Sequence, residues 1–202
     1  MPDHYFSEKP SARSDRRIVE TRLRGKTFAF VTDAGVFSKQ GVDFGSRLLI
    51  ETMAIEPDDE VLDAGCGYGP IGLTAAWLAE RGRAVLVDVN ERAVELAKEN
   101  ARLNRITNVE VLQSDLFEKL DGKRFTKILT NPPIRAGKQV VYRLFEQAFD
   151  HLRPGGELWV VIQNKQGAPS ALDKLESVYG DVEEMERDKG YRVFRARKSP
   201  DK

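Results

Sequence analysis

Cysteine and histidine are scarce in this 202-residue chain, which has one cysteine, Cys66, and two histidines, His4 and His151. A single cysteine excludes an intramolecular disulfide framework, and the two histidines are far apart in the sequence, with no ligand-like spacing around them. We therefore expect no metal site, and we interpret Cys66 as a small apolar filler. The chemistry of this protein must come from other side chains.

Long apolar runs are also absent. No stretch of about 18 apolar residues exists, so no transmembrane helix is expected. The N-terminal segment MPDHYFSEKPSARSDRR lacks the apolar core of a secretory signal, and we expect a cytoplasmic protein. With 41% hydrophobic and 32% charged residues, the composition is that of a globular protein that buries a substantial core.

A net charge is absent as well, because 32 basic side chains balance 32 acidic ones. The distribution along the chain is nevertheless uneven. Residues 1–50 carry nine basic against six acidic side chains, residues 51–120 carry seven against 14, and residues 187–202 carry seven against two. Basic ends around an acidic centre favour a polyanionic partner, although a solvated surface charge explains the same pattern.

From residue 59 onward, short apolar runs alternate with helical patterns. This alternation predicts βαβ units and a mostly parallel sheet that is covered by helices on both faces, with the last strand antiparallel. The expected strands are 60–65, 83–89, 108–115, 124–131, 156–163 and 190–198, and the expected helices are 70–80, 91–104, 138–152 and 168–180.

The first 50 residues have a different pattern. Residues 16–35 alternate weakly and predict a β-hairpin that turns near Arg24-Gly25-Lys26, and the stretch DFGSRLLIETMA that follows predicts a helix packed on the sheet. This segment is too short to bury a core alone. We therefore expect one domain over 1–202, in which 1–50 extends a cofactor-binding and catalytic core formed by 51–202.

The stretch VLDAGCGYGPIG (61–72) joins the first core strand to its helix. Gly65, Gly67 and Gly69 permit positive φ and let a ligand approach the backbone, and ligands of open α/β sheets bind at such strand ends. Gly67, Gly69 and Gly72 match the G-x-G-x-x-G dinucleotide pattern, which is weak evidence alone. Asp63 would repel a pyrophosphate but suits a cationic ligand such as S-adenosylmethionine. A glycine-rich turn without a ligand is the alternative.

Two further acids end successive strands. Asp88 is placed to accept both hydroxyls of a ribose, and Asp115 is placed to accept from an adenine amino group. Each is also a residue type that caps helices, as is Asn90, and this alternative stays open for them. Three acids and a glycine turn at successive strand ends together predict one nucleoside-like cofactor lying across the sheet edge.

The stretch ILTNPPIRAGK (128–138) ends the fourth core strand in Asn131-Pro132-Pro133. Proline stops the strand and stiffens the turn. An exocyclic amine on a base, or an amide nitrogen, is a poor nucleophile with protons to donate. The side-chain oxygen of Asn131 and the Pro132 carbonyl can accept these protons and orient the nitrogen for methyl transfer. A plain turn after a strand is the alternative.

These motifs resemble the class I S-adenosylmethionine-dependent methyltransferases. With GVFSKQGVDFGSRLL (35–49), TNPPIRAGK and GELWVVIQNKQGA, the chain is more specifically similar to the small-subunit (16S) ribosomal RNA guanine-N2 methyltransferases and their single-domain relatives. The resemblance implies a Rossmann-like fold with a seven-stranded sheet and an N-terminal hairpin. It implies catalytic roles for Asn131, Pro132 and Pro133. The cofactor-binding residues that it implies are Asp63, Gly65, Gly67, Gly69, Asp88, Val89, Asn90, Asp115, Leu116, Asn131, Phe37, Ser38 and Ser46.

The chain departs from this family in two ways. Many members that act on bases have Phe or Tyr after the two prolines, stacked on the flipped base, where this chain has Ile134. The longer enzymes also carry an extra N-terminal domain that this sequence lacks. We therefore expect the target to contact Phe37, Ile134, Arg135 and Lys138. Further contacts are expected from the basic hairpin residues (Arg13, Arg16, Arg17, Arg22, Arg24 and Lys26) and the basic C-terminal strand.

The predicted reaction is transfer of a methyl group to guanine N2 of 16S ribosomal RNA, with ribosomal RNA or a ribosomal subunit as partner. Adenine N6 and a protein glutamine amide are alternative acceptors, because both are planar amines. A non-catalytic RNA-binding or assembly protein is a third alternative, which the intact Asn131-Pro132-Pro133 turn disfavours. The sequence does not distinguish a monomer from a homodimer.

Overall fold

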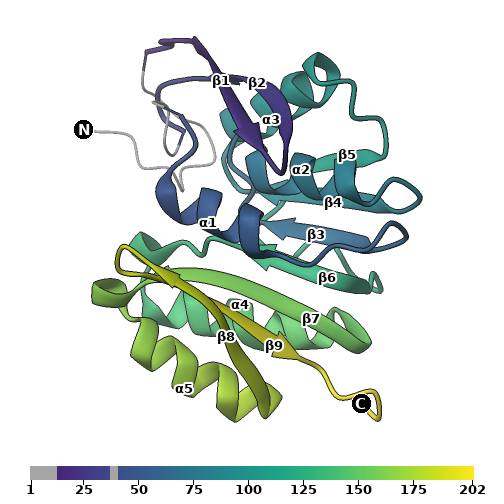
Figure 1. Cartoon of the computed structure of the whole chain (residues 1–202), viewed down its shortest axis with the longest axis vertical. Coiled ribbons are helices and arrows are strands. Elements are labelled where there is room, and N and C mark those ends of the chain that lie inside the picture. Colours follow the sequence, from purple (N-terminus) through teal and green to yellow (C-terminus); the bar gives the residue numbers. More distant parts are fainter. Residues whose placement is uncertain (1–12, 37–40) are drawn as a thin grey trace.

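The computed structural model describes residues 13–36 and 41–202, which form a twisted sheet between two layers of helices and a hairpin at one end (Figure 1). Within this part of the chain, no helix combines the length and apolar character needed to cross a membrane. The strands of the main sheet, from one edge to the other, are β5 (Val109–Gln113), β4 (Arg83–Asp88), β3 (Glu60–Ala64), β6 (Phe125–Thr130), β7 (Leu152–Gln163), β9 (Tyr191–Arg197) and β8 (Asp181–Asp188).

The directions of these strands confirm the predicted sheet. The strands β5, β4, β3, β6 and β7 pair in parallel, whereas β9 is antiparallel to both β7 and β8. The chain order reverses between β3 and β6, because β3 lies between β4 and β6. Such a reversal leaves a crevice at the carboxyl ends of the strands, where ligands of open α/β sheets bind.

Helices cover both faces of the sheet, as the strand–helix alternation predicted. Neighbouring residues of one strand, such as Val61 and Leu62, belong to different buried clusters because successive side chains point to opposite faces. One cluster contains residues of α1 (Phe44–Thr52), α2 (Pro70–Leu78) and α3 (Glu91–Leu103). The other contains residues of α4 (Lys138–Asp150) and α5 (Ala168–Tyr179).

The predicted N-terminal hairpin is also confirmed. The strands β1 (Arg17–Leu23) and β2 (Lys26–Thr32) form a separate two-stranded sheet that turns at Arg24 and Gly25. Both turn residues have positive φ, 53° and 84°, which is the conformation of a two-residue hairpin turn whose twist matches its strands. Figure 1 shows this hairpin, in purple, beside α3 and above α1.

Two asparagines of α3 attach the hairpin to the core. The amide of Asn100 accepts from Val31 N (2.7 Å) and donates to Val31 O (3.0 Å), and Asn104 makes the same pair of bonds with Ala29 (3.0 and 2.8 Å). Residues four apart on a helix are about 6 Å apart, close to the spacing of residues two apart on a strand. The two side chains therefore bond the free edge of β2 much as a neighbouring strand would.

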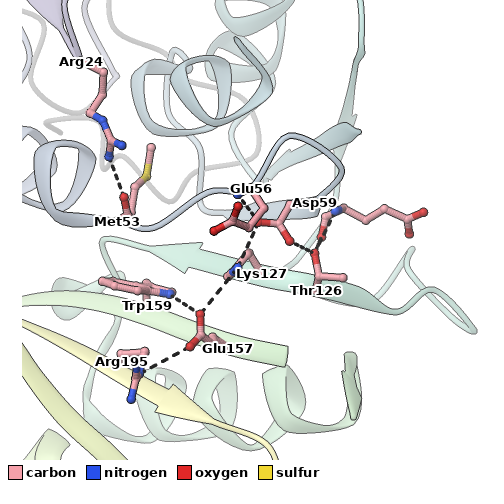
Figure 2. A network of polar contacts seen from close by, with 10 residues as sticks. Arg24, Met53, Glu56, Asp59, Thr126, Lys127, Glu157, Trp159 and Arg195 are labelled. Atoms are coloured by element: carbon pink, nitrogen blue, oxygen red, sulfur yellow. Dashed lines mark hydrogen bonds and ion pairs between the residues drawn. The ribbon is translucent and has the colours of Figure 1, made fainter. Parts of the chain in front are cut away.

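The opposite ends of the central strands hold a network of buried charges (Figure 2). Lys127 of β6 lies 3.0 Å from Asp59 Oδ2 and 3.6 Å from Glu157 Oε1, and its side chain is only 11% exposed. Glu157 also contacts Arg195 of β9 and accepts from the indole of Trp159. These contacts neutralise charges within the sheet, far along the strands from their carboxyl ends.

Two elements differ from the sequence analysis. The edge strand β8 was not predicted, and β7 begins at Leu152, four residues before the predicted start at Gly156. The side chains of β8 are mostly exposed and lack an apolar alternation, so the pattern that identifies a half-buried strand is missing. In β7, Pro154 and the two glycines after it are residue types that disfavour a strand, and the extra residues are absorbed where the register with β6 shifts.

Candidate active site at the carboxyl ends of the strands

A cavity of about 210 Å³ lies where the strands on either side of the reversal end. It gathers residues that follow four different strands, as the strand-end acids and the Asn-Pro-Pro turn predicted. Seven of its lining residues are ones that the sequence singled out: Gly65, Asp88, Val89, Asp115, Leu116, Asn131 and Pro133. Its other lining residues, which the sequence analysis did not name, are Ser114, Ala136 and Val140.

Several predicted residues lie elsewhere. Asp63, Gly67, Gly69, Asn90, Pro132 and Ser46 do not line this cavity, although all are joined to it by the turns and hydrogen bonds described below. Phe37 and Ser38 lie outside the residues that the structure describes. Their predicted contacts with the cofactor and the target therefore stay predictions.

The glycine turn wraps the end of β3 tightly. Gly65, Gly67 and Gly69 have φ values of 81°, 58° and 110°, which other residues rarely adopt. The amides of Gly65 and Cys66 both donate to the Val87 carbonyl of β4, at 2.9 Å. The turn is thus fixed to the neighbouring strand, and Gly65 presents bare backbone to the cavity.

Asp88 ends β4 beside this turn and is only 3% exposed. Its Oδ2 accepts from Gly67 N (2.8 Å) and its Oδ1 accepts from Asn90 N (2.9 Å). These bonds fix the orientation of the carboxylate, which lies in the wall of the cavity. The helix-cap role, left open by the sequence, belongs to Asn90, whose side chain accepts from Ala93 N at the start of α3.

Asp63 is completely buried within β3. Its Oδ2 accepts from Gly72 N (2.8 Å), which ties α2 to the strand, while its Oδ1 has no hydrogen-bond partner among the residues that the structure describes. Burial raises the pKa of this carboxyl to about 7, although the Gly72 bond lowers it and the charge of Asp88 raises it further. A buried carboxylate oxygen without a partner is costly unless a donor or a positive charge lies close by.

Asn131 follows the last residue of β6 and is held on one side only. Its Nδ2 donates to Ser46 Oγ (3.0 Å) and to Asp43 Oδ2 (3.3 Å), at the N-terminus of α1. Asp43 is the N-cap of this helix and accepts from Ser46 N (3.1 Å). The nitrogen of the Asn131 amide is therefore engaged, and its Oδ1 is the side-chain atom left to bind a ligand.

The prolines shape the chain immediately after Asn131. Pro132 is buried, and its carbonyl accepts from Ile134 N (2.8 Å) and keeps one lone pair for a further donor. The turn continues into the short 3₁₀ helix η1 (Ile134–Ala136), which separates two hollows. Pro133 and Ala136 line the cavity described above, whereas the far side of η1 faces a second cavity.

The second cavity has a volume of about 220 Å³ and contains two of the residues predicted to contact the target, Ile134 and Lys138. The Lys138 ammonium lies 5.3 Å from the centre of the Tyr142 ring, which also lines this cavity. Arg135 is exposed and lines neither cavity. Two of the predicted target contacts, Ile134 and Lys138, thus line a different cavity from Asn131 and the predicted cofactor contacts, and η1 contributes residues to both.

The basic segments are less free than their sequence suggests. Arg24 donates to the carbonyls of Ile50 and Met53 and so supports the end of α1. Arg192 and Arg195 of β9 pair with Glu184 and Glu183 of β8, at 2.7 and 2.9 Å. The acidic edge strand β8 therefore neutralises much of the positive charge of β9. This neutralisation could not be predicted from the sequence, because β8 was not predicted.

Two residues near Asn131 were missed by the sequence analysis. Asp43 holds the Asn131 amide, and Tyr68 of the glycine turn is 2% exposed with a hydroxyl that has no hydrogen-bond partner within 13–36 and 41–202. Burial raises the pKa of Tyr68, and the negative charge of Asp43 raises it further. Residue type signals only a helix cap for Asp43 and a core aromatic for Tyr68.

Comparison with known proteins identifies close relatives. Residues 27–195 match the family described as Methyltransferase small domain. The protein YbxB of Bacillus subtilis (strain 168) is 54% identical over 201 residues, which cover 98% of this chain and 100% of YbxB. The ribosomal RNA small subunit methyltransferase C of Escherichia fergusonii is 34% identical over 198 residues, which cover 96% of this chain and 57% of that protein.

The solved structures give the same result. The Thermus thermophilus 16S rRNA N2 G1207 methyltransferase, determined in complex with AdoMet and guanosine, superposes with a TM-score of 0.80 and 28% identity. The match covers 94% of this chain and 52% of that one. The chain thus spans about half the length of the ribosomal RNA methyltransferases that it matches, and the full length of YbxB.

Proposed function

Because the chain belongs to the methyltransferase small domain family, we propose that it transfers the methyl group of S-adenosylmethionine to guanine N2 in 16S ribosomal RNA. The methyl transfer follows from the family, and the acceptor is inferred from relatives named as ribosomal RNA small subunit methyltransferases. The observation that carries the proposal is the position of Asn131. Its amide nitrogen is bonded to Ser46 and Asp43, and within the described residues its amide oxygen has no partner and lies at the cavity at the strand ends.

The residues around this cavity fit S-adenosylmethionine. Asp88 lies in the cavity wall, where it would accept from the two ribose hydroxyls, and Asp115 would accept there from the adenine amino group. The Oδ1 of buried Asp63, which has no partner among the described residues, would be stabilised by a nearby positive charge, and the amino group and sulfonium of the cofactor would supply one. When bound, this cofactor supplies a methyl group on a good leaving group.

The residues after β6 supply the orientation of the acceptor. A guanine N2 amine has two N–H groups and a lone pair that is delocalised into the ring. The Asn131 Oδ1 accepts one of these protons and the Pro132 carbonyl the other, so the nitrogen lone pair is directed at the methyl group. The buried Pro132 and the short bond from Ile134 N to its carbonyl keep the second acceptor in place.

The test uses radiolabelled S-adenosylmethionine with 16S ribosomal RNA, intact small subunits, transfer RNA and a protein extract, all from cells that lack this gene. Labelled RNA is digested to nucleosides and separated. We expect label in N2-methylguanosine from ribosomal RNA or the subunit. Label only in methyladenosine or protein would retain methyl transfer and refute the acceptor, and cofactor binding without any label would refute the proposed activity.

An Asn131→Ala variant tests the assigned role. We expect turnover to fall by roughly 10²- to 10³-fold, as when one hydrogen-bonding group to the reacting atoms is removed, while calorimetry shows nearly unchanged cofactor affinity. A Gln163→Ala variant, altered at the end of the neighbouring strand β7, controls for general damage near the sheet edge. Full activity of the Asn131 variant would contradict the role given to its amide.

A further inference from the structure

The Asn131 amide can adopt two orientations, related by a flip, that fill the same space. Its oxygen and its NH₂ group are nearly equal in size, so packing alone does not decide which of them faces the cavity. Only the orientation with Oδ1 toward the cavity lets Asn131 accept from an amine. In the flipped orientation, the NH₂ group of Asn131 would face the N–H groups of the amine, and two donors cannot form a hydrogen bond. Whatever contacts the other end of the amide therefore determines whether this side chain can orient the acceptor.

Of the two groups that contact this end, one can discriminate. Ser46 Oγ lies 3.0 Å from Asn131 Nδ2, but a hydroxyl both donates and accepts and so tolerates either orientation. The carboxylate of Asp43, 3.3 Å from the same nitrogen, only accepts. It favours the NH₂ group and repels the amide oxygen. Asp43 is thus the group that selects the orientation with Oδ1 toward the cavity.

We propose that Asp43 is a positioning residue for methyl transfer: it fixes the orientation of the Asn131 amide and polarises it. This inference rests on the proposed function and deepens the role of the same site. A charge-assisted bond at Nδ2 draws positive charge to that end of the amide and increases the electron density on Oδ1. The Asn131 oxygen becomes a stronger acceptor for the proton of the incoming amine.

The surroundings of Asp43 hold its carboxylate in this position. Its Oδ2 accepts from Ser46 N as the N-cap of α1, so the same oxygen is anchored to a helix and directed at Asn131. The helix lies unusually close to β9 at this point. A Cβ on Gly45 would be 2.8 Å from the Tyr191 ring and 3.3 Å from Asp43 Oδ2. The bare backbone of Gly45 therefore lets the N-terminus of α1 approach closely enough to place the carboxylate.

An N-cap role alone does not require an acidic residue. Ser and Asn cap helices about as well as Asp, but Ser is too short to reach Asn131, and Asn is neutral. Because the same Oδ2 accepts from both Ser46 N and Asn131 Nδ2, an Asn that keeps the cap still presents an oxygen to Asn131. The variant Asp43→Ser therefore keeps the cap and removes both the orientation and the polarisation of the Asn131 amide, whereas Asp43→Asn keeps the cap and removes the charge. This separation makes the proposal testable without disrupting α1.

The experiment measures methyl-transfer kinetics, cofactor affinity and thermal unfolding for both variants. We expect kcat to fall by roughly 10- to 100-fold, the range of one charge-assisted hydrogen bond. KM for the RNA, cofactor affinity and the unfolding midpoint should change little. As a control, Glu51→Ala removes a bond to Arg24 N at the far end of α1, and it should lower the unfolding midpoint without lowering kcat.

A second measurement does not depend on activity. In ¹⁵N-labelled protein, the side-chain NH₂ resonances of Asn131 should shift in both variants, and their hydrogen exchange should accelerate in Asp43→Ser, while the backbone amides of α1 stay in place. Unchanged Asn131 resonances, an unchanged kcat, or a loss of kcat matched by the Glu51→Ala control would each overturn the proposal. If the wild-type protein methylates no substrate, the proposed function fails, and the resonances still decide whether Asp43 fixes the amide.

Discussion

The bond between α3 and the hairpin gives a quantitative prediction, because Asn100 is completely buried and serves three backbone groups. Its Oδ1 accepts from Val31 N, and its Nδ2 donates to Val31 O (3.0 Å) and to the carbonyl of Tyr68 (2.9 Å). The substitution Asn100→Asp keeps the shape and the acceptor but removes both donated hydrogens. Two buried carbonyls, one in the hairpin and one in the glycine turn, then lose their donor.

A buried acceptor that loses its partner costs about 1–3 kcal/mol. Two such carbonyls predict a loss of about 2–6 kcal/mol at neutral pH, out of the roughly 5–15 kcal/mol that typically stabilises a folded protein. Burial and the two facing carbonyls raise the pKa of the introduced carboxyl above the unfolded-state value of about 3.9. The folded state then binds the proton more tightly, so the stability of the variant falls as pH rises above that value.

Urea unfolding, followed through the fluorescence of the buried Trp159, measures this effect at pH 5 and pH 8. We expect Asn100→Asp to be clearly less stable than the wild type, and more so at pH 8. The matched control is Asn104→Asp, which loses equivalent bonds at a half-buried position where water replaces them. A loss below about 1 kcal/mol at pH 8 for the Asn100 variant, or equal losses for both variants, would refute this reasoning.

Two other substitutions test the packing and the charges beneath the site. Gly72→Ala places a Cβ 2.5 Å from Leu86 and 2.9 Å from Asp63 Oδ2, so we expect overpacking to destabilise the protein by about 1–3 kcal/mol in thermal unfolding; an unchanged midpoint would show that α2 shifts freely. Lys127→Met leaves the nearly buried carboxylates of Asp59 and Glu157 without their shared cation, and we expect a loss of about 3–5 kcal/mol in urea. A stability equal to that of the wild type would mean that water solvates the two carboxylates well enough without the lysine.

The architecture was predictable from the sequence because most of its elements are buried on a regular period. The expected helices at 70–80 and 91–104 are observed as Pro70–Leu78 and Glu91–Leu103, and the hairpin turn lies where its glycine indicated. The strand β8 was not predictable in this way. It is held by its backbone pairing with β9 and by cross-strand charge pairs such as Arg195 opposite Glu183, and such pairing leaves no local pattern in either segment.

The site was predictable to the same degree and for a related reason. Polar residues that directly follow buried strands must meet at one edge of a parallel sheet, so Asp88, Asp115 and Asn131 could be placed together. The hydrogen bond from the Asn131 amide to Asp43 could not be predicted, because Asp43 is 88 residues away and its sequence context indicates only a helix cap. Asn100 is a similar case, because its bonds reach β2 and the glycine turn, 69 and 32 residues away.

The attachment of the hairpin to α3 also bears on how the chain matures during translation. The strand β2 is synthesised before the helix α3 that it packs against. Val31 can form its hydrogen bonds with Asn100 only after another 69 residues have been added. At about 5–20 residues per second, this delay is on the order of 3–14 s. During that time the apolar Phe28 and Phe30 and one edge of β2 have no partner from the rest of the domain. The nearby positive charges of Arg22 and Lys26 then oppose aggregation of this apolar segment. The segment that is synthesised first is therefore expected to be among the last to reach its final packing.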